Sequence, residues 1–125
     1  MRLLLDTHVL LWWLADDPLL TVDARAAIVE SDLAVVSTAS AWEISMKRSL
    51  GKLDAPDDLA AQLVRDQFTV LPIHLDHALH AGSLPHIHRD PFDRMLVAQA
   101  QVEDLVVITT DTNIPRYDVR VLAAA

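Results

Sequence analysis

The sequence has no cysteine and only two glycines among its 125 residues. The lack of cysteine excludes disulfide bonds and thiolate metal sites, and it suits a reducing compartment. Hydrophobic residues make up 52% of the chain, a content that indicates a packed globular protein and excludes a disordered one. The length accommodates one sizeable core, so residues 1–125 are predicted to form a single domain.

Basic residues are also few, because ten Lys and Arg stand against eighteen Asp and Glu, for a formal net charge of −8. Proteins that bind nucleic acids are typically basic, since Lys and Arg on the phosphates supply most of the affinity. The charge therefore weighs against a nucleic-acid function. The objection weakens if part of the acidic excess is a metal site, because two divalent cations would neutralise four of the eight charges.

Long hydrophobic runs are absent as well. Residues 1–14 have some of the apolar character of a signal peptide, but Asp6 and His8 interrupt the run and no small-residue cleavage site follows it. No apolar stretch approaches the roughly 20 residues that span a bilayer. The sequence thus predicts a soluble protein of the cytoplasm.

Short apolar runs alternate with helical patterns along the whole chain. Strands are expected at residues 3–5, 33–37, 68–71 and 105–109, with an edge strand at 119–122. Helices are expected at residues 9–14, 22–30, 39–50, 56–67, 75–81 and 91–102. This alternation predicts an α/β layered fold with a mainly parallel sheet. Functional sites in such folds lie at the carboxyl ends of the strands.

Four acidic residues occupy positions at that edge of the predicted sheet. Asp6 follows the first strand and Asp111 follows the fourth, whereas Glu43 and Asp93 lie in the first turns of two helices. Carboxylates held close together repel one another unless a cation is present. Oxygen ligands without cysteine favour Mg²⁺ or Mn²⁺ over zinc, and such ions catalyse phosphodiester displacement.

Each acid can also be explained as a structural residue. Asp90, just before Asp93, is best explained as the N-cap of the helix at 91–102. Glu43 can pair with a lysine one turn later, and Asp111 can be an ordinary turn aspartate. Asp6 is the hardest to explain in this way, because an unpaired charge directly after an apolar strand is costly if buried. The joint placement of the acids is the argument for a site.

Four blocks of the sequence resemble bacterial PIN domains of the VapC toxin type. They read LLDTHVLLW at residues 4–12, STASAWEI at 37–44, HRDPFDRMLVAQA at 88–100 and TTDTNI at 109–114. The blocks occur in order over essentially the whole chain, and the third is the most specific. The resemblance implies a three-layer α/β/α PIN-like fold around a mainly parallel five-stranded sheet.

The resemblance also implies a function, that of a Mg²⁺- or Mn²⁺-dependent endoribonuclease that forms a homodimer and is neutralised by a VapB-like antitoxin. The family's catalytic and metal-binding acids correspond here to Asp6, Glu43, Asp93 and Asp111. The family often has a polar or acidic pair after the last of these. In this chain residues 112–113 add no charge there, so no fifth acidic ligand is predicted.

Residues next to the acids are expected to support them. The hydroxyl of Thr7 and that of Thr109 or Thr110 are expected to hold carboxylates or waters in place. Lys47 and Arg94 adjoin the acids and are the first candidates for contacts with RNA phosphates. Further cations that could meet phosphates are Arg48, Arg89 and Arg116.

Histidines and tryptophans add two weaker patterns. The histidines are His74, His77, His80, His86 and His88, and they lack a paired zinc motif, so surface or hydrogen-bonded side chains are expected. The tryptophans Trp12, Trp13 and Trp42 are expected in the core or in a dimer interface, with base stacking as an alternative for one of them.

Two other functions fit part of the pattern. A phosphotransfer enzyme of the haloacid-dehalogenase type also has an aspartate after its first strand, but it needs a second one where this chain has His8. A receiver-type signalling domain would need an acidic pair and a lysine that are not evident. A catalytically silent PIN-like interaction module would keep the fold without the activity, and metal affinity would distinguish it from a nuclease.

Overall fold

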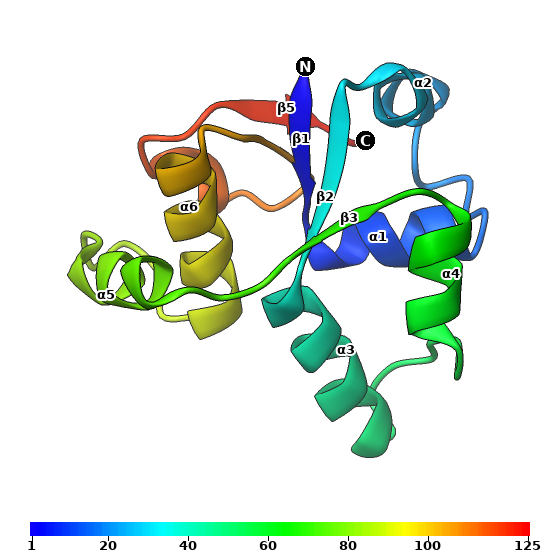
Figure 1. Ribbon diagram of the computed structural model, residues 1–125, viewed down its shortest axis with the longest axis horizontal. Coiled ribbons are helices and arrows are strands. Elements are labelled where there is room, and N and C mark those ends of the chain that lie inside the picture. Colours follow the sequence, from blue (N-terminus) through cyan, green and yellow to red (C-terminus); the bar gives the residue numbers. More distant parts are fainter.

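The computed structural model describes residues 1–125, and one five-stranded sheet runs through its centre (Figure 1). The strands are β1 (Arg2–Leu5), β2 (Leu33–Ser37), β3 (Thr69–Leu71), β4 (Val106–Thr109) and β5 (Val121–Ala123). All neighbouring pairs are parallel, in the order β3-β2-β1-β4-β5. The predicted five-stranded parallel sheet is confirmed, and its strands all end at the same edge.

Helices cover both faces of this sheet. They are α1 (Thr7–Leu14), α2 (Val22–Glu30), α3 (Thr38–Ser49), α4 (Leu59–Arg65), α5 (Leu75–Ser83) and α6 (Pro91–Glu103), with a short 3-10 helix η1 (Ile114–Arg116). In Figure 1, α1, α2 and α4 lie to one side of the strands and α5 and α6 to the other. Helix α3 extends past the carboxyl ends of the strands. The predicted three-layer α/β/α arrangement is confirmed.

The alternation of side chains along β1 divides the core in two. Leu3 and Leu5 are fully buried in a cluster that includes residues of α1, α2 and α4. Leu4, between them, is fully buried in the cluster of α5 and α6. Successive strand residues point to opposite faces, so an uninterrupted apolar strand is what a sheet covered on both sides requires.

Local signals in the sequence account for most helix ends. Thr21 caps α2 by accepting the N–H of Ala24 at 3.1 Å. Gly51, with a φ of +69°, follows α3 in the left-handed conformation that glycine adopts without steric cost. Both ends were predicted correctly.

Two predicted elements had wrong boundaries at both ends; in addition, α1 begins at Thr7 and α5 ends at Ser83, each two residues beyond the predicted limit. The helix expected at 56–67 is shorter, because α4 begins only after Asp58, whose side chain makes no capping bond to the helix backbone. The chain leaves that helix before Gln67, which has a φ of +62°. The expected edge strand at 119–122 lies at Val121–Ala123, where its pairing with β4 sets its position. None of the helices is both long and apolar enough to cross a membrane.

Removing a side chain from the central strand tests this packing. Leu4→Ala is expected to lower the free energy of unfolding by about 2–5 kcal/mol, because the deleted atoms leave a cavity between β1 and α6. The measurement is chemical denaturation followed by circular dichroism. The control Val22→Ala, at a position 82% exposed, should change the stability by less than about 0.5 kcal/mol. Equal effects of the two substitutions would contradict the described core.

Candidate metal centre

Asp6 begins the site, because it follows β1 directly and is the N-cap of α1. It is buried, and its Oδ1 accepts the N–H of His8 at 2.7 Å while its Oδ2 accepts the hydroxyl of Thr109. Burial raises the pKa of Asp6, and the two hydrogen bonds oppose that rise. The sequence alone offered no partner for the buried carboxylate of Asp6. In the structure, two hydrogen bonds stabilise it.

Thr109, the last residue of β4, connects two of the predicted acids. Its hydroxyl donates to Asp6 and accepts the N–H of Asp111 at 2.9 Å. Thr110 is exposed and its side chain makes no hydrogen bond, so of the two threonines considered Thr109 is the one in contact with a carboxylate. Because β1 and β4 are adjacent, this single hydroxyl fixes the two acids relative to each other.

Asp111 is also held by the backbone that follows it. Its Oδ1 accepts the N–H groups of Asn113 and Ile114 at 2.6 and 3.1 Å. This is the turn aspartate that the structural interpretation anticipated. The other carboxylate oxygen, Oδ2, makes no hydrogen bond and remains available to a ligand.

Glu43 reaches the site from the second turn of α3 and is only 6% exposed. Its Oε2 lies 2.6 Å from Nζ of Lys47, one helical turn later. Helix α3 is tied to α1 by Thr7, whose hydroxyl donates to Ser40 at 3.0 Å. Thr7 therefore connects the helix that Asp6 caps to the helix that carries Glu43, whereas the expected contact with a carboxylate is not present.

Asp93 lies in the first turn of α6. Burial raises its pKa to about 8, and nearby negative charges add to the rise. In decreasing order of effect these charges belong to Asp90, Asp111, Asp6 and Glu43. The four acids predicted from the sequence are thus close enough to act on one another, although they come from four separate segments.

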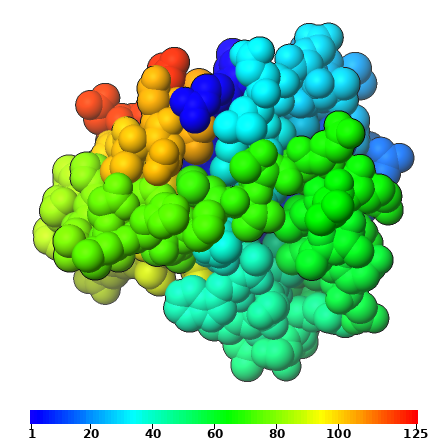
Figure 2. Space-filling model, in the orientation of Figure 1, coloured from blue at the N-terminus to red at the C-terminus, as the bar shows by residue number.

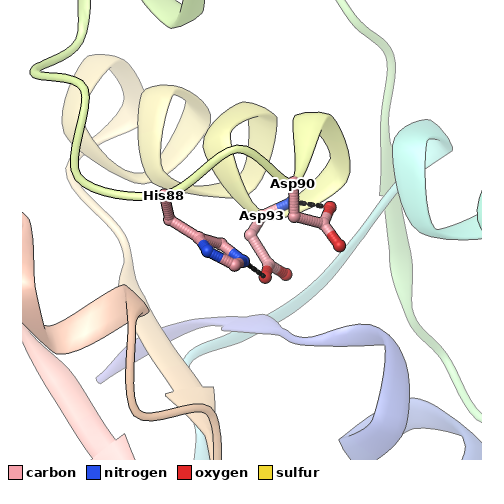
Figure 3. Close-up of side chains that lie close together, drawn as sticks. All are labelled: His88, Asp90 and Asp93. Atoms are coloured by element: carbon pink, nitrogen blue, oxygen red, sulfur yellow. Dashed lines mark hydrogen bonds and ion pairs between the residues drawn. The ribbon is translucent and has the colours of Figure 1, made fainter.

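The tightest group of potential ligands includes a residue that the sequence interpretation did not select. Ligand atoms of His88, Asp90 and Asp93 all lie within 4.8 Å of one another, and no other three such side chains do so (Figure 3). Nε2 of His88 is 3.4 Å from Oδ2 of Asp93. The other predicted acids, Asp6, Glu43 and Asp111, surround Asp93 without forming so tight a group.

His88 precedes α6 by three residues, so its proximity to Asp93 depends on the loop that leads into the helix. The hydroxyl of Tyr117 holds this loop, since it accepts the N–H of His88 at 3.1 Å and donates to its carbonyl at 3.3 Å. Asp90 caps α6 as expected, accepting the N–H of Phe92 at 2.8 Å and that of Asp93 at 3.1 Å. The only sequence signal near this loop was the predicted start of α6.

Asp6, Glu43, Asp93 and Asp111 are named here the acid cluster. The oxygen atoms of the acid cluster fit a divalent cation. Glu43 Oε1, Asp93 Oδ1 and Asp111 Oδ2 make no hydrogen bond. The only fully buried side-chain polar atom without a partner is Gln99 Oε1, so these three oxygens are accessible. Anionic oxygens with no competing sulfur are the ligands that Mg²⁺ and Mn²⁺ prefer.

Lys47 acts as the internal counter-ion of the cluster. Its hydrogen bond to Glu43 raises its pKa, and the charges of Glu43, Asp90 and Asp93 raise it further, against the opposing effect of burial. The helical pair of Glu43 and Lys47 that the structural interpretation anticipated is therefore present. It coexists with the acid cluster and does not exclude a ligand role for Glu43.

Arg94 has a role that differs from the predicted phosphate contact. Its guanidinium donates to the carbonyls of Ala81, Leu84 and Pro85 at 2.8, 3.1 and 2.9 Å. Those carbonyls belong to the end of α5 and the turn after it. With its donors occupied by the backbone, Arg94 fastens α6 to that turn and is not a free cation.

The predictions for the histidines and tryptophans agree with the structure at some positions and not at others. His77 is fully buried, with Nε2 2.8 Å from Oε1 of Glu103, so it is a hydrogen-bonded core histidine as expected. Trp12 and Trp13 pack against the core cluster of α1, α2 and α4. Trp42 is instead 61% exposed and stands edge-on to Phe92, with ring centroids 5.1 Å apart. A core position for Trp42 is therefore excluded.

Comparison with known proteins adds an independent observation. The family model described as PIN domain matches residues 3–120, nearly the entire chain. No curated protein matches the sequence.

Solved structures with the same fold include three toxin-related complexes. VapBC2 from Rickettsia felis, bound to a DNA fragment from its promoter, aligns with a TM-score of 0.76 at 12% identity, over 100% of both chains. DNA-bound VapBC from Salmonella typhimurium aligns with a TM-score of 0.73 at 19% identity, over 100% of this chain and 99% of the other. A toxin-antitoxin complex from Klebsiella pneumoniae aligns with a TM-score of 0.72 at 17% identity, over 99% of this chain and 98% of the other. At such identities the likeness shows the fold alone.

The pKa of Asp93 leads to a prediction about stability. The folded protein keeps a proton on Asp93 up to a pH of about 8, whereas the unfolded chain releases it near the ordinary value of 3.8. Without divalent metal, stability should therefore fall as the pH rises from about 4 to about 8. Asp93→Asn removes this titration and should be more stable than the parent at pH 8 by roughly 1–3 kcal/mol, since partial exposure reduces the full effect.

The measurement is urea unfolding of both proteins in EDTA at several pH values. Near pH 4 the two stabilities should converge, because the carboxyl of the parent is then protonated and neutral. A stability difference that does not change with pH would contradict a raised pKa at Asp93. Asp118→Asn, at an exposed position, is a matched control and should show no such trend.

Proposed function

The chain belongs to the PIN domain family, and on this basis we propose that it is a Mg²⁺- or Mn²⁺-dependent endoribonuclease, the toxin component of a type II toxin-antitoxin system. The observation that carries the proposal is the convergence of Asp6, Glu43, Asp93 and Asp111 at the carboxyl edge of the sheet, expressed in the raised pKa of Asp93. A group of acids under this strain is stabilised by a divalent cation.

The residues would share the work as follows. The free oxygens of Glu43, Asp93 and Asp111 would hold the cation together with Asp6, which Thr109 keeps in position. A bound Mg²⁺ or Mn²⁺ supplies Lewis acidity to the hydrolysis of an RNA phosphodiester. Lys47 balances the cluster through Glu43, and its ammonium would be the nearest cation for a substrate phosphate if Glu43 held the metal.

The assignment to the VapC type is supported by the four blocks of sequence resemblance and by the fold shared with VapBC and toxin-antitoxin complexes. We therefore propose a VapB-like antitoxin as the natural partner and the cytoplasm as the place of action. A haloacid-dehalogenase-type phosphotransferase has no support, since the position of its second aspartate holds the exposed His8.

A homodimer is supported by apolar side chains left exposed on or beside three elements, α3, β3 and α5. These are Trp42 on α3, Leu50 just after that helix, Val70 on the edge strand β3, Ile73 just after it, and Leu75 and Leu79 on α5. Figure 2 shows these three elements together on the face that it presents. Exposed apolar groups on neighbouring elements are typical of an interaction surface, and an edge strand is usually covered.

Cleavage of RNA tests the proposed activity. Purified protein with Mg²⁺ or Mn²⁺ is expected to cut a pool of structured RNAs, and EDTA should stop the reaction. Asp6→Asn should reduce the rate by at least about 100-fold, because a neutral amide holds the cation less tightly. Arg2→Gln, at the opposite edge of the sheet, is the control and should cut normally.

The outcomes separate the alternatives. Cutting that resists EDTA, or that Asp6→Asn leaves unchanged, would contradict the proposed site. Folded protein that neither binds Mn²⁺ in calorimetry nor cuts RNA would be a silent interaction module with the PIN fold.

Sedimentation tests the homodimer. The protein is expected to sediment at twice the chain mass of 13.9 kDa at micromolar concentration. Leu79→Asp should shift it toward the monomer, because a charge would be buried in the interface. The control Val29→Asp places the same charge on α2, at a position 72% exposed on another surface, and should leave the dimer intact. A parent protein that is monomeric at this concentration would refute the homodimer.

A further inference from the structure

A cavity of about 900 Å³ lies between the end of α5 and the start of α6, and it is the largest of the five on the protein. It is named here the α5–α6 groove and is lined by Gly82, His86, Ile87, His88, Arg89 and Arg94. Two arginines and two histidines thus account for four of its six residues.

The charge of the α5–α6 groove is unlike that of the other four cavities. The chain carries a net charge of −8, and each of the other four cavities is lined by at least one Asp or Glu. The lining of the α5–α6 groove contains no carboxylate. An anionic ligand would therefore meet no carboxylate on the lining of the groove itself.

Two polar side chains of the groove, Arg89 and His86, have no partner within the protein. Arg89 and His86 are exposed and make no hydrogen bond or ion pair within the protein. The wall around them is fixed, because Arg94 binds the carbonyls of Leu84 and Pro85 and Tyr117 holds the backbone of His88. A free guanidinium on a braced wall is a suitable donor for a phosphate, which it can bind through two parallel hydrogen bonds.

The groove also adjoins the acid cluster. His88 lines the groove, and its ring is turned toward Asp93, 3.4 Å away (Figure 3). Arg89 stands next to His88 in the chain and immediately before the helix cap Asp90. A chain of phosphates with one member at the acid cluster would therefore pass the α5–α6 groove with a neighbouring member.

We propose that the α5–α6 groove binds a backbone phosphate of single-stranded RNA beside the bond to be cut, with Arg89 as the main ligand and His86 as a second donor. This inference rests on the proposed nuclease function and names the part of the surface that recognises its substrate. It also gives an acidic protein a local site for a polyanion, because affinity depends on the charges at the contact and not on the total.

The experiment measures binding of a fluorescent single-stranded RNA by anisotropy, in Ca²⁺ and over a range of salt concentrations. Arg89→Gln is expected to weaken binding about 5- to 10-fold and to reduce the slope of log K against log salt by about 0.7, the loss of one phosphate contact on a single strand. Arg89→Lys should restore most of the slope. Arg120→Gln removes the same charge beside β5, at the opposite edge of the sheet, and should change neither quantity.

Equal affinity and salt slope for Arg89→Gln and Arg120→Gln would overturn the inference, and so would a parent protein that does not bind RNA. Kinetics distinguish this failure from failure of the nuclease proposal. With an active enzyme, Arg89→Gln should raise KM more than it lowers kcat. RNA binding that depends on Arg89 in a protein that cuts nothing would retain the groove and refute the nuclease.

Discussion

Burial of several mutually repelling carboxylates at one edge of the sheet is the constraint on which the rest of this structure depends. Asp93 shows it most directly, since burial and four neighbouring acids raise its pKa to about 8. Groups in this position stay together only if the scaffold holds them rigidly. The parallel sheet does so, because β1 and β4 lie side by side and end at the same edge, and Thr109 joins Asp6 to Asp111 across them.

The same acids also stabilise the helices that carry them. Asp6, Asp90 and Asp111 each accept backbone N–H groups at the start of α1, α6 and η1. A carboxylate has two oxygens, so capping a helix with one leaves the other for a second partner. Structural and functional explanations of these residues are therefore compatible, and Asp111 shows it plainly, with one oxygen in a turn and the other free.

The cations of the protein are divided between bracing and binding. Lys47 balances Glu43, and Arg94 is bound to the backbone carbonyls at the end of α5. Arg89 has no such partner and stands in a groove without carboxylates, although it is only five residues from Arg94. The overall charge of −8 is thus a poor guide to what a single patch can bind. A polyanion bound in this groove would contact the exposed guanidinium of Arg89 beside the carboxylates at the edge of the sheet.

The sequence by itself determined the layered parallel fold, and it singled out four acids that the structure brings together at one edge of the sheet. Local patterns can be recognised without knowledge of distant partners. Such patterns include apolar strands such as residues 3–5, helix caps such as Asp90, and acids at strand ends. Only the tertiary structure decided the roles of Arg94, His88 and Trp42. Their surroundings come from α5, from the loop held by Tyr117 and from α6, at sequence separations that no spacing rule covers. A long side chain bonds to whatever the fold brings near it, so its partner is known only when the packing is known.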